Sequence, residues 1–203
     1  AEQMSGARRA KTPKGQDRRQ QIVDAAAEML RVGGPGVVSH RSVARQVGCS
    51  LSAMTYYFSG LEDLLEEAGR INIARWARRA EGVAESLELG EKVSDRAAIV
   101  DHILAATLPV DEILLGHYQQ LVAAGASDPV SRAYRTGRDR LNAALSRVLD
   151  SCQVDCEPAL VIGLVDGAAV SALSEGRDVR GTATTLLEMM LDKLEAMKSA
   201  ARP

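Results

Sequence analysis

Aromatic side chains are scarce in this sequence, which has one Phe, one Trp and four Tyr among 203 residues, although 46% of its residues are hydrophobic. Ala, Leu and Val must therefore fill the core, and side chains of this size suit closely packed helices. Sustained alternation of apolar and polar residues, which marks a half-buried strand, is also missing. We predict an all-α fold, in a chain long enough to bury a sizeable core.

Cysteine is scarce as well, because Cys49, Cys152 and Cys156 are too few for the disulfide scaffold of a small secreted domain. Cys152 and Cys156 are four residues apart, but neither a His nor a third Cys nearby completes a metal site. The sequence has no Gly-rich phosphate loop, no HExxH pair and no Ser–His–acid spacing. We therefore expect reduced thiols, no metal or other cofactor, and no enzymatic activity.

Long apolar runs are missing too. The longest, residues 159–173, is interrupted by Asp166 and is shorter than the roughly 20 residues that span a bilayer. No N-terminal stretch has the apolar centre of a signal peptide. We expect a soluble, cytoplasmic protein with no membrane partner.

The net charge of −2 indicates no partner by itself, but the charges are unevenly distributed. Residues 1–60 contain nine Lys and Arg against four Asp and Glu, and the rest of the chain contains 16 against 23. A basic first third on an acidic body is typical of a protein whose N-terminal part binds a polyanion. A solvated charged surface is the alternative interpretation.

Residues 39–58 have the pattern of two short helices joined by a tight turn. Ser39 and Ser50 can each cap a helix by accepting hydrogen bonds from backbone N–H groups. Gly48 stands between them, where a helix ends most readily in the left-handed conformation. This is the pattern of a helix-turn-helix, and its alternative is an ordinary helical hairpin inside an all-α core.

In the second of these helices Met54 and Phe58 lie one turn apart and should face inward. The residues left for the outer face are Leu51, Ser52, Thr55 and Tyr56. A short helix with hydroxyl groups and phenols on its outer face can enter the major groove of DNA.

The joint spacing over residues 17–70 resembles the N-terminal domain of TetR-family transcriptional regulators. The matching segments are residues 21–26, 33–36, 42–50, 54–58 and 62–65. Three positions depart from the family pattern. Leu61 replaces a usual Lys, Thr55 a usual Tyr, and Tyr57 a usual His.

The resemblance implies a DNA-binding domain of three helices over residues 17–60 and a larger effector-binding and dimerisation domain over 61–203. A long helix over 61–88 would connect them. Composition adds a flexible basic arm over residues 1–16, which is small, polar and basic. The implied function is that of a transcriptional regulator, and most members of the family repress transcription until a small effector releases them from DNA.

The resemblance also places Arg41 where it can reach a base edge, since Arg offers two donors to the two acceptors of guanine. Five residues are assigned to phosphates, namely Ser39, His40, Ser50, Tyr56 and Tyr57. Four remain for base edges and thymine methyl groups, namely Leu51, Ser52, Ala53 and Thr55. A homodimer would present two such helices and so bind a near-palindromic operator in double-stranded DNA.

The resemblance places an effector pocket among the fourth to seventh helices, after residue 60, but does not identify the effector. The candidate contacts are Trp76, His102, His117, Tyr118 and Tyr134. Each of them could instead be an ordinary core or surface residue. Two rival functions remain open, namely an architectural DNA-binding protein without an effector and a helical carrier of small molecules.

The last two expected helices indicate a dimer interface. Small residues recur on the first of them, and closely approaching helix backbones require such residues. The interface residues that we predict are Gly163, Gly167, Val170, Ser171, Leu186, Leu187, Met190 and Leu194. A core formed within one chain is the alternative, and the pairing of these two helices in TetR-family dimers favours the interface.

Overall fold

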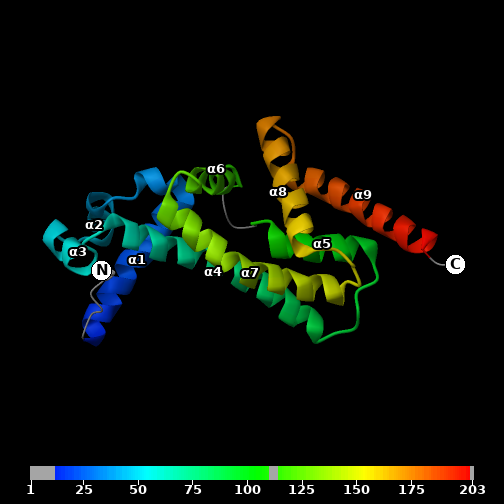
Figure 1. Cartoon of the computed structure of the whole chain (residues 1–203), viewed down its shortest axis with the longest axis horizontal. Helices are drawn as coiled ribbons and strands as arrows, with labels where there is room; N and C mark the ends of the chain where they lie inside the picture. The colour runs from blue at the N-terminus through cyan, green and yellow to red at the C-terminus, as the bar shows by residue number, and fades with distance from the viewer. Residues whose placement is uncertain (1–11, 110–113, 202–203) are drawn as a thin grey trace, which may run out of the picture. The chain divides into compact units, whose positions relative to one another are not determined.

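The computed structural model describes residues 12–109 and 114–201, and within these ranges it contains helices and no strand (Figure 1). The prediction of an all-α fold is confirmed. The elements are α1 (Pro13–Gly33), η1 (Pro35–Val37), α2 (His40–Val47), α3 (Leu51–Tyr57), α4 (Leu61–Glu88), α5 (Arg96–Thr107), α6 (Leu114–Ala124), α7 (Asp128–Ser151), α8 (Pro158–Ser174) and α9 (Val179–Ala200).

The chain forms two compact units, and α4 and α7 each contribute to both. Unit 1 comprises Ala1–Ala74 and Glu112–Arg138, and unit 2 comprises Arg75–Asp111 and Asp139–Pro203. Unit 1 therefore contains the three N-terminal helices together with α6 and the first halves of α4 and α7. The functional boundary between residues 60 and 61 stays a prediction.

Helix α1 begins earlier than the sequence predicted. Thr12 caps it by accepting a hydrogen bond of 3.2 Å from the backbone N–H of Gly15, and Pro13 occupies the first helical position. A proline is well tolerated there because its missing N–H would have no helical partner. Residues 13–16 are therefore helical rather than part of a flexible arm. From the sequence we expect Asp17 to cap this helix, but it lies inside the helix. Residues 1–11 of that arm lie outside the described residues.

The core of unit 1 joins α1, α2, α3 and α4. Its largest fully buried side chains include Ile22 and Leu30 of α1, Met54 of α3, Phe58 just after α3, and Leu64 of α4.

Small residues bring α4 and α7 close together. A Cβ atom at Gly137 would lie 2.4 Å from a methyl group of Ile73, so only glycine fits that position.

In unit 2, salt bridges join the second halves of α4 and α7. Arg140 pairs with Glu81, and Arg147 pairs with Glu88, each through two nitrogen–oxygen contacts. The two pairs recur every seven residues on both helices, which is two turns along each.

Helix α9 also begins earlier than expected. From the sequence we expect this helix to begin at Gly181 or Thr182. In the structure it begins at Val179, and Asp178 caps it by accepting a hydrogen bond of 2.9 Å from the backbone N–H of Gly181. From the sequence we expect Asp111 to cap a helix that begins at Glu112, and both residues lie outside the described residues. No helix in the described ranges is both long and apolar enough to cross a membrane.

Candidate nucleic-acid interface

The turn between α2 and α3 has the local structure that the sequence predicted. Ser39 and Ser42 cap α2 reciprocally, because each side-chain oxygen accepts a hydrogen bond from the backbone N–H of the other residue, at 2.9 and 3.0 Å. This arrangement is a capping box, with Ser in the position that Glu or Gln usually takes. Gly48 ends α2 with φ of 71°, and Ser50 caps α3 by accepting from the N–H of Ala53 at 3.1 Å. The predicted helix-turn-helix is confirmed as a local structure.

The inner face of α3 is fixed by buried side chains. Met54 and Phe58 are fully buried, as predicted. The guanidinium of Arg19 lies 4.6 Å from the centre of the Phe58 ring, where it makes a cation–π contact, and it also forms a bidentate salt bridge with Glu67. One side chain of α1 thus connects the end of α3 to α4. No periodic signal in the sequence pairs Arg19 with these two residues.

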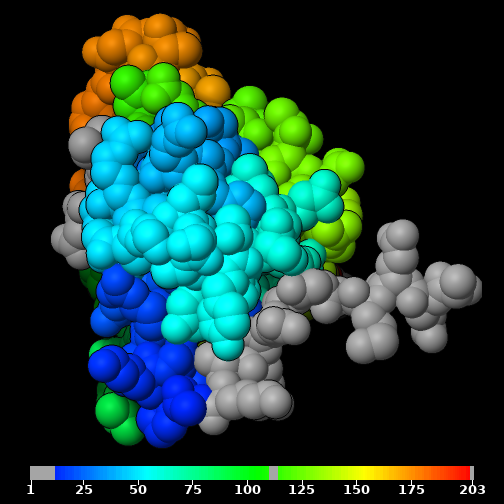
Figure 2. Space-filling view, turned by 90° about the vertical axis from the view of Figure 1, so that its left-hand side faces the viewer, coloured from blue at the N-terminus to red at the C-terminus, as the bar shows by residue number. Residues whose placement is uncertain are grey.

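The outer face of α3 stays accessible. Leu51 and Tyr56 expose 48% and 59% of their surface, and Ser52 and Thr55 are exposed beside them. Figure 2 shows this helix, in cyan, on the face of the molecule turned to the viewer. Large apolar and aromatic side chains exposed among hydroxyl groups are suited to the edges of bases and to thymine methyl groups.

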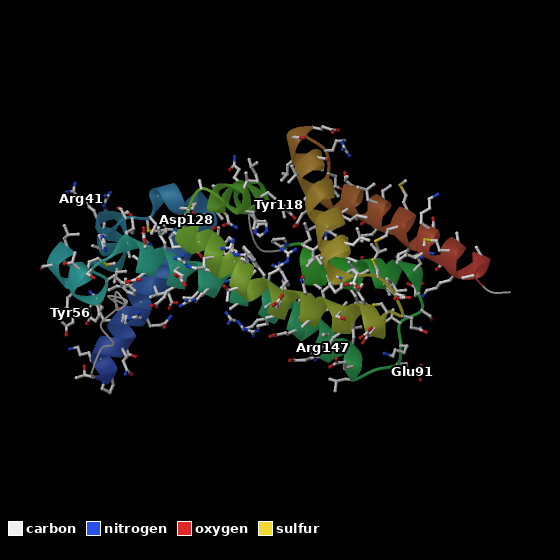
Figure 3. The ribbon with its side chains drawn as sticks, in the orientation of Figure 1. Arg41, Tyr56, Glu91, Tyr118, Asp128 and Arg147 are labelled. Carbon is white, nitrogen blue, oxygen red and sulfur yellow. The ribbon has the colours of Figure 1, made fainter. Side chains whose placement is uncertain are left out.

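At the N-terminal end of α2, Arg41 is exposed to solvent and His40 is hydrogen-bonded within the protein. Arg41 is exposed and points away from the core, at the opposite edge of the α2–α3 hairpin from Tyr56 (Figure 3). His40 is half-buried, and its Nε2 lies 2.8 Å from the carbonyl oxygen of Phe58. Because a carbonyl oxygen only accepts, Nε2 carries the proton and donates. His40 thus connects the start of α2 to the end of α3, a contact that sequence reasoning missed.

The remaining interface candidates are less exposed. Ala53 and Tyr57 are half-buried, and the rings of Tyr56 and Tyr57 meet edge to face with centres 5.2 Å apart. Tyr57 also lines a hollow between α3 and the first turns of α1.

The effector candidates belong to different units. His117 and Tyr118 of α6 are buried in unit 1, with ring centres 4.9 Å apart. Tyr134 of α7 is half-buried in the same unit. Trp76, which is 6% exposed, and His102, which is half-buried, belong to unit 2.

Gln120 of α6 is a polar residue of the same region that the sequence did not single out. It is 1% exposed, and its Oε1 accepts a hydrogen bond of 2.8 Å from the hydroxyl of Tyr134. Its Nε2 is buried without a hydrogen-bond partner among the described residues. A buried donor left unpaired costs about 1–3 kcal/mol of folding free energy. An acceptor on a ligand or a water molecule would remove this cost. Gln reads as a surface residue in a sequence, so no pattern predicted its burial.

The predicted dimer residues divide into exposed and buried ones. On α8, Gly163, Gly167 and Ser171 are exposed, and Val170 exposes 46% of its surface. On α9, Leu187 is fully buried in the chain's own core, so its side chain offers no surface to a partner. The other α9 candidates, Leu186, Met190 and Leu194, are half-buried.

Cys152 is buried and Cys156 is half-buried. Burial raises the pKa of the Cys152 thiol and that of the Cys156 thiol, which keeps both protonated and poorly nucleophilic near neutral pH. Within the ranges that the structure describes, no cluster of three or more His, Cys, Asp or Glu residues could hold a metal ion.

Comparison with known proteins finds similarity in structure rather than in sequence. No protein-family model matches the chain, and no curated protein matches it in sequence. A protein described as a TetR-family transcriptional regulator, from Mesorhizobium loti MAFF303099, superposes with a TM-score of 0.66 at 15% identity, over 89% of this chain and 98% of that one. A transcriptional regulator from Rhodococcus sp. RHA1 gives 0.62 at 21% identity, over 86% and 96%.

A third neighbour was solved with a small molecule. It is described as a transcriptional regulator from Saccharomonospora viridis in complex with choline, and it gives a TM-score of 0.64 at 18% identity, over 86% of this chain and 95% of that one. Identities this low establish the fold alone. The chain has the all-α fold of TetR-family transcriptional regulators.

Proposed function

We propose that this protein is a sequence-specific DNA-binding transcriptional regulator, a cytoplasmic repressor that a small-molecule effector releases from its operator. The observation that carries the proposal is the outer face of α3, which exposes Leu51, Ser52, Thr55 and Tyr56 while Met54 and Phe58 are completely buried. A helix held this firmly on one side and left bare on the other can insert into the major groove without losing its own packing.

The residues take different roles on the DNA. Arg41, exposed on α2, reads a guanine through its two N–H donors. The exposed or half-buried residues Leu51, Ser52, Ala53 and Thr55 of α3 meet base edges and thymine methyl groups. Contacts to phosphates, which set register and carry no sequence information, fall to Ser39, His40, Ser50, Tyr56 and Tyr57. The bond of His40 to Phe58 uses Nε2, so a contact from this ring to a phosphate oxygen, which only accepts, requires a proton on Nδ1 as well.

The regulator acts as a homodimer on a near-palindromic operator. Its partner surface is the exposed part of α8, where a Cβ atom added at Gly163 or Gly167 would meet nothing within 4 Å. Leu160 and Val170 on the same helix expose 61% and 46% of their surface, and apolar exposure of this kind favours association. The half-buried Leu186, Met190 and Leu194 of α9 complete the surface.

The effector acts through α6. The neighbour solved with choline shows that this fold accommodates a small molecule in another protein. In unit 1 the hydrogen-bonded pair Gln120 and Tyr134, with His117 and Tyr118, forms the polar and aromatic group that we assign to the effector. Trp76 and His102 belong to unit 2, and their role as effector contacts stays a prediction from the sequence.

Helix α6 also lies directly against the end of α1, which gives the effector a route to the proposed DNA-binding domain. A Cβ atom at Gly34, just after α1, would approach Ala123 of α6 at 3.5 Å, and one at Gly116 of α6 would approach the carbonyl oxygen of Val32 at the same distance. An effector that displaces α6 must therefore shift the end of α1 or lose this packing. By linkage, effector and DNA should then weaken each other by the same factor.

Selection from a pool of random duplexes tests the proposed function. The pool is incubated with the full chain at about 0.15 M salt, because binding without salt reports charge alone. Enrichment of one near-palindromic motif, bound by two chains per duplex in sedimentation, is the expected result. An unenriched pool that is nevertheless bound would instead support the architectural DNA-binding protein and overturn the regulator.

A further inference from the structure

Helix α3 contains no charged residue. Its sequence from Leu51 to Tyr57 is Leu-Ser-Ala-Met-Thr-Tyr-Tyr. A helix that enters a DNA groove lies between two rows of phosphates, because the major groove is only about 12 Å wide and a backbone borders it on each side. Since α3 supplies no cation, the elements on either side of it must supply the positive charge.

On one side the cations are on α2. Arg41 and Arg45 are both exposed there, one near each end of the helix. Figure 3 shows Arg41 at this edge of the hairpin and Tyr56 at the other.

On the other side the cations are on the first turns of α1. A hollow with a volume of about 650 Å³ lies between this end of α1 and the end of α3. Its lining includes the cations Lys14 and Arg18, which are one helical turn apart, and Tyr57 of α3. Figure 2 shows the start of α1, in blue, and α3, in cyan, on the same face of unit 1.

Hydrogen bonds hold one of these cations in place. The guanidinium of Arg18 donates to Oε1 of Gln21 at 3.0 Å and to the carbonyl oxygen of Gly48 at 3.4 Å. Arg18 is thereby joined to the turn between α2 and α3. An Arg has five N–H donors, so these two bonds leave others for a ligand.

We propose that this hollow binds a backbone phosphate of the DNA, on the opposite side of α3 from Arg41 and Arg45. Lys14 and Arg18 neutralise the phosphate, and the Tyr57 hydroxyl donates a hydrogen bond to it. The inference rests on the proposed function and adds a second line of phosphate contacts to it. Asp17 also lines the hollow, and its carboxylate opposes the phosphate.

Salt dependence measures such a contact directly. For duplex DNA, each phosphate contact contributes about 0.9 to the slope of the logarithm of affinity against the logarithm of salt concentration. Fluorescence anisotropy with a duplex of arbitrary sequence supplies the slope, because a phosphate contact acts on every sequence. Because both cations neutralise the same phosphate, we expect Lys14→Gln and Arg18→Gln each to reduce the slope by up to about 0.9 per protomer, which is up to about 1.8 for a dimer.

Two further variants sharpen the test. Asp17→Asn removes the opposing carboxylate and should tighten binding. Arg135→Gln removes an exposed cation of α7 that does not line the hollow, and it should leave the slope as in the wild type. Circular dichroism identifies any variant that has unfolded. Lys14 is exposed, so its variant should fold and decides the question even if Arg18→Gln unfolds.

The outcomes separate this inference from the proposed function. The phosphate site would be overturned if Lys14→Gln kept the wild-type slope and Asp17→Asn bound DNA no more tightly than the wild type. The regulator would stand in that case if the random-duplex selection still yields one motif. A selection that yields no motif, with the slopes changed as expected, would overturn sequence-specific regulation and keep the phosphate site.

Discussion

The α2–α3 hairpin and the α8–α9 pair both expose apolar residues, but the surroundings of those residues differ. On α3, Leu51 and Tyr56 are surrounded by hydroxyl groups. On α8, Leu160 and Val170 lie beside the bare glycines Gly163 and Gly167. The first surface can hydrogen-bond with a partner over most of its area, as a nucleic acid requires. The second offers fewer hydrogen-bonding groups, and we expect a closely approaching apolar surface to cover it.

The largest effect that we expect concerns the inner side of the hairpin. Phe58→Ala should destabilise the protein by about 3–5 kcal/mol, because it opens a cavity under α3 and removes the ring beneath Arg19. Thermal unfolding followed by circular dichroism measures the loss. Tyr56→Ala, on the exposed side of the same helix, is the matched control and should leave the midpoint nearly unchanged while DNA binding weakens. Equal losses in the two variants would mean that the faces of α3 are wrongly assigned.

A smaller effect distinguishes base recognition from phosphate contact. Arg41→Ala should cost about 1–3 kcal/mol at one base pair of each half-site and relax specificity there. Titration of duplexes altered at single positions measures this loss. Arg45→Ala, the other exposed arginine of α2, should weaken binding to all duplexes alike. Unchanged discrimination in Arg41→Ala would remove this residue from base recognition.

Capping can be distinguished from DNA contact at the start of α3. Ser50→Ala should cost about 1 kcal/mol of stability, because the backbone N–H of Ala53 loses its acceptor. Ser52→Ala removes an exposed hydroxyl that lies 3.0 Å from the Ser50 hydroxyl but is not itself the helix cap, and it should affect binding more than stability. Urea unfolding of both variants tests the contrast. A Ser50→Ala protein as stable as the wild type would show that the cap contributes nothing.

The smallest effect that we expect is a pH dependence of the free energy of unfolding, which arises in unit 2. The hydrogen bond from Arg140 holds the pKa of Glu81 below its ordinary value of 4.5. Because the folded state binds the proton less readily than the unfolded state, the stabilisation is complete above that value and is lost as pH falls through the lowered pKa. The loss should be under about 1 kcal/mol, since the pair is accessible to solvent. Urea unfolding at several pH values should show Glu81→Gln to be less sensitive to pH between about 5 and 3 than the wild type.

The sequence predicted the hairpin well because its signals are local. Ser39, Gly48 and Ser50 act within four residues of their own position, and the burial of Met54 and Phe58 follows from helical spacing. The start of α1 was missed because Thr12 and Asp17 both offer a capping oxygen, and only the proline after Thr12 favours the earlier start.

Contacts between distant residues could not be predicted in the same way. Arg19 and Glu67 are 48 positions apart, and no periodicity connects them. Leu187 belongs to an apolar stripe on α9, but the stripe alone does not say whether the same chain or a second one covers it. Gln120 has a polar side chain that the fold buries. Its hydrogen bond with Tyr134 therefore could not be predicted from the sequence.

The specificity ratio of the wild-type protein tests the account most directly. It is the affinity for the motif obtained by selection divided by the affinity for the same duplex with that motif scrambled, both measured at about 0.15 M salt. The account predicts a ratio of at least about 1,000, the lower end for specific DNA-binding proteins. A ratio near one would contradict it, because the exposed face of α3 would then not read sequence.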